Sequence, residues 1–202
     1  MDVLTTLGRT LGFSFAAGLN LYATVAVLGL ASRYGWVDLP PQYRIFDNKF
    51  VIIAALVMYA IEFIADKVPW VDTVWDGIHT AIRPLGGALI AVTTLGEASP
   101  TTQGIVALLG GAVAASTHVT KASTRAVANA SPEPFSNWLL SLAEDAFVLT
   151  LGYVALHYPI VALVVCLVLL AVIGVFFLSI VRAARRWWGS KRPPPAPLTA
   201  PS

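Results

Sequence analysis

The chain has 202 residues, of which 57% are hydrophobic and only 12% are charged, whereas an ordinary soluble domain has about 25% charged residues. Its formal net charge of +2 is small, and the basic excess lies near the C-terminus, which argues against nucleic acid as a partner. A single cysteine excludes a disulfide framework and a cysteine-based zinc site. The composition therefore predicts an all-α integral membrane protein that resides in a lipid bilayer.

Six apolar segments follow one another along the chain, and we expect each to form a transmembrane or re-entrant helix. The first is longer than the core of a signal peptide, so we interpret it as a retained span. The fourth carries many polar side chains, which predicts that the other helices enclose it. The segments are residues 11–31, 50–65, a third that ends near 96, 104–128, 138–156 and 160–181.

The sequence does not determine where the third segment begins. Its apolar part, residues 84–96, is short for a full crossing. The span therefore either begins inside the charged stretch before it or dips into the membrane and returns. Whether residues 104–117 cross fully is equally open.

The two ends of the chain differ in character. We expect one transmembrane domain over residues 1–186 and a disordered, proline-rich tail over 187–202. Basic residues at 182–192 predict that this tail is cytoplasmic, in a multi-pass protein of the inner (plasma) membrane. Six spans would then place the N-terminus in the cytoplasm as well.

The sequence also contains a weak internal similarity. Residues 11–20 and 109–118 share a leucine, a glycine and two alanines in register, and the alignment matches Asn20 with His118. It also puts Glu62 opposite Glu144. Two inverted three-helix halves, residues 1–98 and 103–186, would explain the match, although glycine and alanine are common in membrane helices in any case.

An unusual charged stretch occupies residues 62–83. In a helix, Asp72, Asp76, His79 and Arg83 are spaced by four, three and four residues and share one face. Asp72, Asp76 and His79 could ligate a divalent cation, the one cofactor that the sequence suggests. The alternative is that this stretch is a solvated cytoplasmic loop.

Ionisable residues within the apolar segments are the main functional signal. Each charge at mid-bilayer costs about 2.5–3.5 kcal/mol, so such side chains must be paired, hydrated in a cavity or at the interface. We expect a polar cavity that passes a proton, another cation or a small polar solute; the alternative is a hydrogen-bonded network that only fixes the packing. The candidate pathway residues are Asn20, Glu62, Asp66, His79, His118, Lys121, Arg125, Glu144 and Asp145.

Two other function classes remain open. Lys121 and Arg125, one helical turn apart among threonines and serines, could hold the phosphate of a lipid in a membrane enzyme or carrier. We favour the alternative that these two residues form ion pairs with acidic residues of the bundle, because acids and bases are nearly matched in number there. A scaffold that recruits partners through its tail is the third class, and a homo-oligomer is compatible with any of them.

The stretches GFSFAAGLNLYAT and IEFIADKVPWVDTVWDGIHTAIRPLGGAL resemble a family of small bacterial multispanning membrane proteins that carries a domain-of-unknown-function label. The resemblance covers roughly residues 7–151. It implies a membrane protein and brings no activity, substrate or assigned site.

Overall fold

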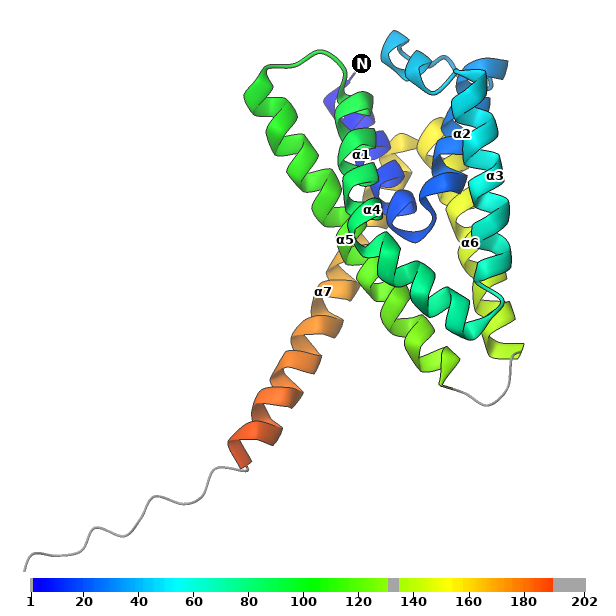
Figure 1. Ribbon diagram of the computed structural model, residues 1–202. Helices are drawn as coiled ribbons and strands as arrows, with labels where there is room; N and C mark the ends of the chain where they lie inside the picture. The colour runs from blue at the N-terminus through cyan, green and yellow to red at the C-terminus, as the bar shows by residue number, and fades with distance from the viewer. Residues whose placement is uncertain (1, 131–134, 191–202) are drawn as a thin grey trace, which may run out of the picture.

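A computed structural model describes residues 2–130 and 135–190, which are helical apart from short connections (Figure 1). This agrees with the all-α prediction. The helices are α1 (Val3–Leu19), α2 (Leu21–Tyr34), the 3-10 helix η1 (Pro41–Ile45), α3 (Lys49–Ala65), α4 (Pro69–Leu95), α5 (Pro100–Asn129), α6 (Phe135–His157) and α7 (Pro159–Ser190).

The prediction that residues 11–31 form a single span is wrong, because these residues form parts of two helices. The chain leaves helical geometry at Asn20, whose φ of -147° and ψ of 99° are extended. The Asn20 side chain caps α2 by accepting a hydrogen bond from the Ala23 amide at 2.9 Å. In Figure 1, α1 descends to the middle of the bundle and α2 returns toward the end it came from, so the two helices form a re-entrant hairpin.

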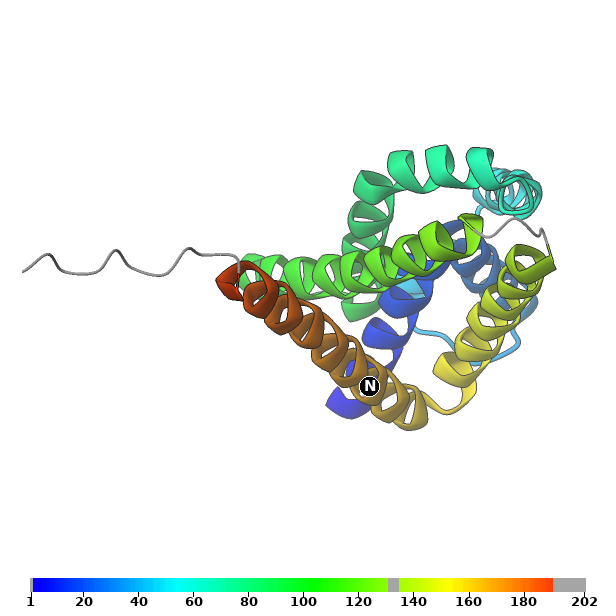
Figure 2. The same cartoon turned by 90° about the horizontal axis from the view of Figure 1, so that it is seen from below.

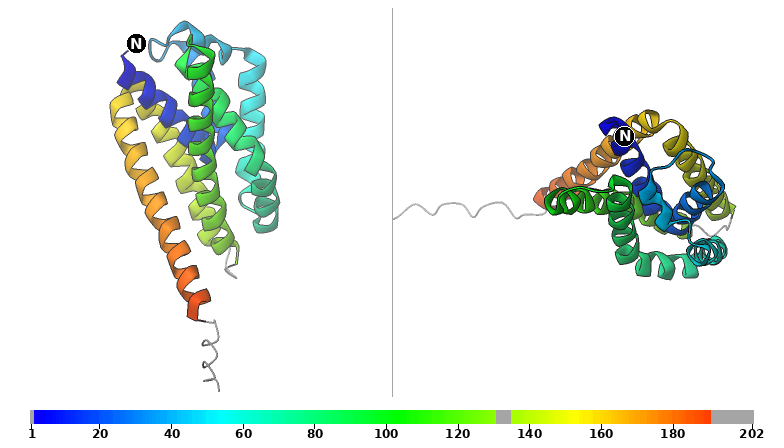
Figure 3. Two further views of the ribbon diagram at one scale, coloured as in Figure 1. Left: turned by 90° about the vertical axis from the view of Figure 1, so that its left-hand side faces the viewer. Right: turned by 90° about the horizontal axis from the view of Figure 1, so that it is seen from above.

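The hairpin occupies the centre of the bundle. Figure 2 and the right-hand view of Figure 3 show α1 and α2 surrounded by the longer helices. Phe13, Ala16 and Leu28 of the hairpin are 0% exposed. The tip at Asn20, 2% exposed, is therefore enclosed by protein, as broken helices within a membrane require.

The charged stretch belongs to a long helix and not to a loop. α4 runs for 27 residues, so the third span begins inside the charged stretch, which was one of the two predicted alternatives. Asp72, Asp76, His79 and Arg83 are all buried, as expected for one helical face. Figure 1 shows that α4 bends along its length. Pro84 lies within α4, and a proline inside a helix removes a backbone hydrogen bond and favours such a kink.

α5 crosses α4 at a close contact built from glycines. A Cβ added at Gly110 would meet the Ala91 side chain and lie 2.9 Å from the Gly87 carbonyl oxygen. Small residues at such crossings let helices approach closely in membranes. α5 is not enclosed as predicted, since only one face is buried and Leu108 and Val127 on its other side are each 76% exposed.

The distribution of side chains is the reverse of that in a soluble domain. Large apolar residues are exposed along α3 to α7, whereas many charged side chains in the described residues are less than 9% exposed. α4, α5, α6 and α7 are long and apolar enough to cross a membrane. Together these features identify a membrane-type helical protein.

The two ends of the described chain lie at opposite ends of the bundle. Figures 1 and 3 show the start of α1 at one end and the finish of α7 at the other. The arrangement of six crossings with both termini on one side is not confirmed, because α1 and α2 form a hairpin and the described ends lie at opposite ends of the bundle. α7 remains helical to Ser190, beyond the predicted domain limit at 186, and the rest of the tail lies outside the described residues.

The predicted inverted repeat is not confirmed. α5 is continuous through His118, whereas the residue aligned with it, Asn20, ends one helix and begins another. The two segments that the alignment matched therefore have different backbone structures.

Candidate functional site

Charged side chains from four helices meet in one half of the bundle, which we call the charged cluster. Consecutive helices run in opposite directions, so the last part of α3 and α5 lies beside the first part of α4 and α6. Each of these parts carries acidic or basic residues that face inward. The cluster comprises Glu62, Asp66, Asp72, Asp76, Arg83, Lys121, Arg125, Glu144 and Asp145.

Arg125 joins three helices. Its Nη2 donates to Asp66 Oδ2 at 2.9 Å and to Glu144 Oε2 at 2.7 Å. Its Nη1 donates to the Asp66 carbonyl at 2.9 Å and to Asn137 Oδ1 at 3.0 Å, and lies 3.8 Å from Asp72 Oδ1. Arg125 therefore ties the end of α3 to α6.

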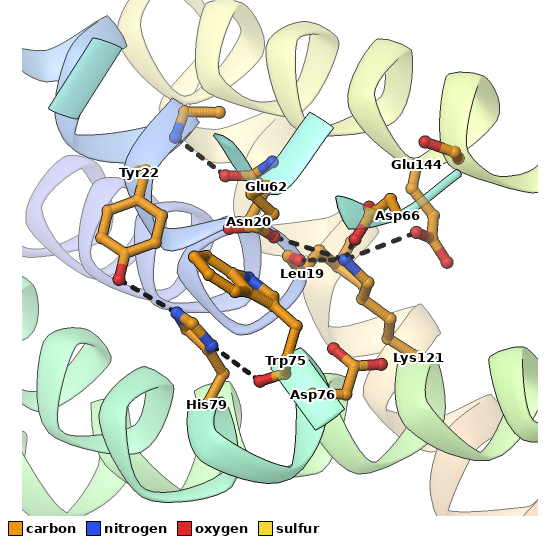
Figure 4. A network of polar contacts seen from close by, with 12 residues as sticks. Leu19, Asn20, Tyr22, Glu62, Asp66, Trp75, Asp76, His79, Lys121 and Glu144 are labelled. Atoms are coloured by element: carbon orange, nitrogen blue, oxygen red, sulfur yellow. Dashed lines mark hydrogen bonds and ion pairs between the residues drawn. The ribbon is translucent and has the colours of Figure 1, made fainter. Parts of the chain in front are cut away.

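Lys121, one turn earlier on α5, connects the cluster to the hairpin tip (Figure 4). Its Nζ donates to the Leu19 carbonyl at 3.2 Å, at the end of α1. The same nitrogen lies 3.4 Å from Glu62 Oε1, 3.3 Å from Asp66 Oδ2 and 3.6 Å from Glu144 Oε2. A cation at this position also complements the partial negative charge at a helix C-terminus.

Arg83 makes the corresponding contacts from α4. Its Nη2 donates to Glu62 Oε1 at 2.7 Å, and its Nη1 to the Gly18 carbonyl at 3.4 Å. Nη1 also donates to His118 Nδ1 at 2.8 Å. Because a guanidinium can only donate, Nδ1 accepts and the His118 proton sits on Nε2, which faces the Asp76 carbonyl at 3.1 Å.

His79 lies at the edge of the cluster. Its Nδ1 donates to the Trp75 carbonyl at 2.8 Å, and its Nε2 faces the Tyr22 hydroxyl at 2.9 Å (Figure 4). The Trp75 ring stacks on the imidazole with centroids 4.6 Å apart. These contacts fix the ring against α2, on the opposite side from Lys121.

Asn20 and Asp145 form the last link. Asn20 Nδ2 donates to Asp145 Oδ1 at 3.2 Å, so the residue that breaks the hairpin also contacts α6. Asp145 Oδ2 accepts no hydrogen bond from the described part of the chain. The structure thus brings all nine candidate pathway residues into one region, with His79 at its border.

The charges of the cluster do not balance. Within residues 2–130 and 135–190, the cluster contains three cations and six carboxylates. The cations are Arg83, Lys121 and Arg125, and the carboxylates are those of Glu62, Asp66, Asp72, Asp76, Glu144 and Asp145. Glu62 Oε2, Asp66 Oδ1, Asp76 Oδ2 and Asp145 Oδ2 are buried and accept no hydrogen bond from the described residues. Fully ionised, the cluster would therefore carry excess negative charge.

Lys67 lies beside the cluster, and counting its charge as well would still leave six carboxylates against four cations. Its Nζ lies 3.1 Å from the centroid of the Phe63 ring and donates to the Phe63 carbonyl at 2.9 Å and to Ser141 at 3.4 Å. Partial burial lowers the pKa of Lys67, and the Asp145 and Asp66 carboxylates oppose that shift. This lysine sits beside the cluster, at the connection between α3 and α4.

The predicted metal ligands are not brought together as a set. Asp72 accepts from Asn129 at 2.8 Å, Asp76 lies 3.3 Å from Arg83, and His79 bonds to Tyr22. Among the described residues, no group of three or more His, Cys, Asp or Glu side chains is placed to hold a metal ion. The shared helical face is used for contacts with different neighbours.

Sequence reasoning missed several members of the site. Arg83 shares the helical face of Asp76 and His79, so its spacing indicates a role, although it is not among the predicted pathway residues. Asn137 and Tyr22 carried no comparable signal, because their partners come from distant parts of the chain.

Two cavities adjoin this region. An apolar one of about 440 Å³ lies between α2, α3 and α4 and reaches the cluster only through Tyr22. A smaller one of about 220 Å³ lies between α4 and α5 and is lined by Asp76, Thr80, Arg125 and Asn129, among others. Only the second has polar side chains of the cluster in its wall.

No curated protein and no solved structure matches this chain. A family model described as a domain of unknown function, DUF4126, matches residues 7–179, which include every helix from α2 to α6 and the whole charged cluster. The matched region covers most of the chain, and the chain therefore belongs to the DUF4126 family.

Proposed function

We propose that the protein carries protons or another monovalent cation across a membrane by way of the charged cluster. The observation that carries this proposal is the excess of carboxylates over cations in a buried site. An uncompensated buried charge costs several kcal/mol, so protons or cations must accompany the surplus carboxylates. A site that has to acquire and release positive charge is suited to moving it.

The hairpin gives the proposal a structural basis. Broken helices whose ends meet near the middle of a membrane are a recurrent feature of ion-coupled transporters, where the exposed helix ends help to form the site. Here the last carbonyls of α1 face Arg83 and Lys121, and Asn20 faces Asp145. A change at the tip would therefore alter the surroundings of both the cations and a carboxylate.

The contacts of Lys121 and Arg125 favour ion pairing over phosphate binding. Arg125 donates through all three of its nitrogens to Asp66, Glu144 and Asn137. Lys121 is surrounded by three carboxylates, which would repel a phosphate. We therefore do not propose a lipid-phosphate enzyme, and a role of the tail as a scaffold concerns residues outside those described.

The test is flux into liposomes that contain the purified protein and a pH-sensitive dye, with potassium and sodium gradients applied in turn. Asp145→Asn keeps the acceptor for Asn20 and removes a buried charge, so it should lower the flux about tenfold or more if one buried carboxylate carries the ion. Asp47→Asn, at an exposed ion pair with Arg33, is the matched control and should leave the flux unchanged. Flux no greater than in empty liposomes for every cation would reject the proposal.

A further inference from the structure

The cavity between α4 and α5 presents hydrogen-bond acceptors that receive no hydrogen bond from the described part of the chain. We call it the α4–α5 cleft; Thr73, Asp76, Gly77, Thr80, Ala122, Arg125, Ala126 and Asn129 line it. Asp76 is only 4% exposed, and its Oδ2 accepts no hydrogen bond within the described residues. Asn129 Oδ1 is likewise buried and without a donor there. A buried acceptor left unsatisfied costs roughly 1–3 kcal/mol.

The cation in the wall of the cleft does not satisfy these acceptors. Arg125 directs its nitrogens to Asp66, Glu144 and Asn137. Two carboxylates at 2.9 Å and 2.7 Å compensate its charge. Arg83 lies 3.3 Å from Asp76 Oδ1 but makes its shortest contact, at 2.7 Å, with Glu62.

Asp72 places a second carboxylate near the cleft, next to Asn129 in its wall. Its Oδ2 accepts from Asn129 Nδ2 at 2.8 Å, which orients the amide. The amide nitrogen is thereby engaged with Asp72, and the amide oxygen remains as an acceptor. Thr73 and Thr80 donate to the carbonyls of Pro69 and Asp76. The Thr73 oxygen also accepts from Asn129 Nδ2 at 3.3 Å, and the Thr80 oxygen faces His118 Nε2 at 3.1 Å, so each hydroxyl keeps one further lone pair that can accept.

A ligand for this cleft must therefore be cationic and must donate hydrogen bonds. The volume of about 220 Å³ exceeds the roughly 30 Å³ of one water molecule several times, so the cleft does not form a tight cage for a bare ion. A small organic cation with N–H donors fits both the space and the acceptors.

We propose that the α4–α5 cleft binds a primary ammonium group, either that of a small free amine or that of a lipid headgroup. This deepens the proposed function and rests on it in one respect, namely that the cleft adjoins the cluster through Asp76 and Arg125, which line it. The N–H groups of the ammonium bond to Asp76 Oδ2 and Asn129 Oδ1, and its charge offsets that of Asp76.

The test is calorimetric titration of the full-length protein in phosphatidylcholine nanodiscs, whose lipid has no N–H group. Methylammonium should bind saturably, whereas tetramethylammonium, with the same charge and no N–H, should not. Asp76→Asn should weaken methylammonium binding about tenfold or more, as expected for losing a charge-assisted hydrogen bond.

A second variant tests the site if Asp76→Asn does not fold. A Cβ added at Gly77 has nothing within 4 Å, so Gly77→Leu should fill the cleft without disturbing the backbone. It should also weaken methylammonium binding about tenfold or more. Gly104→Leu is the matched control. Gly104 is equally open but lies in the first half of α5, away from the cleft, so this variant should bind methylammonium as the wild type does.

Nanodiscs of phosphatidylethanolamine distinguish the two sources. If the headgroup occupies the cleft, methylammonium should bind more weakly in them than in phosphatidylcholine; equal binding indicates a free amine. The inference would be overturned if methylammonium does not bind, or if tetramethylammonium binds equally well. It would also be overturned if Gly77→Leu binds methylammonium as strongly as the wild type does. Binding without liposome flux would instead reject the proposed function and leave the cleft assigned.

Discussion

At the scale of single residues, buried ion pairs hold the cluster together. The Arg83 and Glu62 side chains are 0% exposed and 2.7 Å apart, so neither can be solvated if its partner is lost. Removing one member of a buried pair is expected to cost about 3–5 kcal/mol, much more than losing a surface pair.

Arg83→Met should therefore lower the free energy of unfolding by about 3–5 kcal/mol, because Glu62 remains buried without its shortest contact. The double variant Arg83→Met with Glu62→Gln should recover at least about 1 kcal/mol of this loss. Thermal unfolding in detergent measures both. The single variant Glu62→Gln completes the cycle, and a double variant whose loss equals the sum of the two single losses would show that the pair is not coupled.

At the scale of elements, the hairpin and the α4–α5 crossing position the cluster. The hairpin tip supplies two carbonyls to Arg83 and Lys121, and Asn20 both caps α2 and bonds to Asp145. The crossing brings the buried face of α4 against that of α5, so His118 can contact Arg83.

The hairpin tip gives the first prediction at this scale. Asn20→Ala removes the α2 cap and the bond to Asp145, and should destabilise the protein by about 2–3 kcal/mol. Asn20→Ser keeps a capping oxygen and should lose about 1 kcal/mol less. The two variants are compared by their unfolding midpoints in detergent, and equal midpoints would show that the cap contributes nothing.

The crossing of α4 and α5 gives the second prediction at the scale of elements. Gly110→Val should destabilise the protein by about 2–3 kcal/mol, because its side chain would overlap Ala91 and the Gly87 backbone. Gly104→Val, on the same helix with nothing within 4 Å, should change stability by less than about 0.5 kcal/mol. If both variants unfold alike, helix propensity rather than close packing explains the effect.

At the scale of the whole molecule, an apolar surface encloses a charged interior, and the ends of the described chain lie on opposite sides (Figure 1). The connections before α3 and before α5 lie at the end where α1 begins. Basic residues follow at the finish of α7, which lies at the other end, and the positive-inside rule predicts that this end is cytoplasmic.

This arrangement can be checked with a membrane-impermeant thiol reagent applied to intact cells. Asp38→Cys and Glu97→Cys, both exposed at the α1 end, should be labelled from outside, and Arg185→Cys only after lysis. The native Cys166 is buried and should stay unlabelled, which provides the control. Labelling of all three positions from the same side would contradict the topology.

The sequence predicted those features that depend on local spacing. The buried face of α4 could be predicted, because Asp72, Asp76, His79 and Arg83 repeat with the period of a helix. The break at Asn20 could not be predicted, since residues 11–31 are mostly apolar with no charge and no proline. The partners that stabilise the break, Asp145 among them, come from distant helices. Pairing between remote residues likewise explains why the charge imbalance became apparent only in the structure.

The central claim is that exchangeable positive charge neutralises the surplus carboxylates of the cluster. Infrared spectroscopy of the protein in lipid nanodiscs measures this directly, through the carbonyl stretch of protonated carboxyl groups. At neutral pH and without added cation, the wild type should show that band, and Asp145→Asn should alter it. A spectrum with only ionised carboxylates, from a sample that elemental analysis finds free of bound cations, would contradict the account.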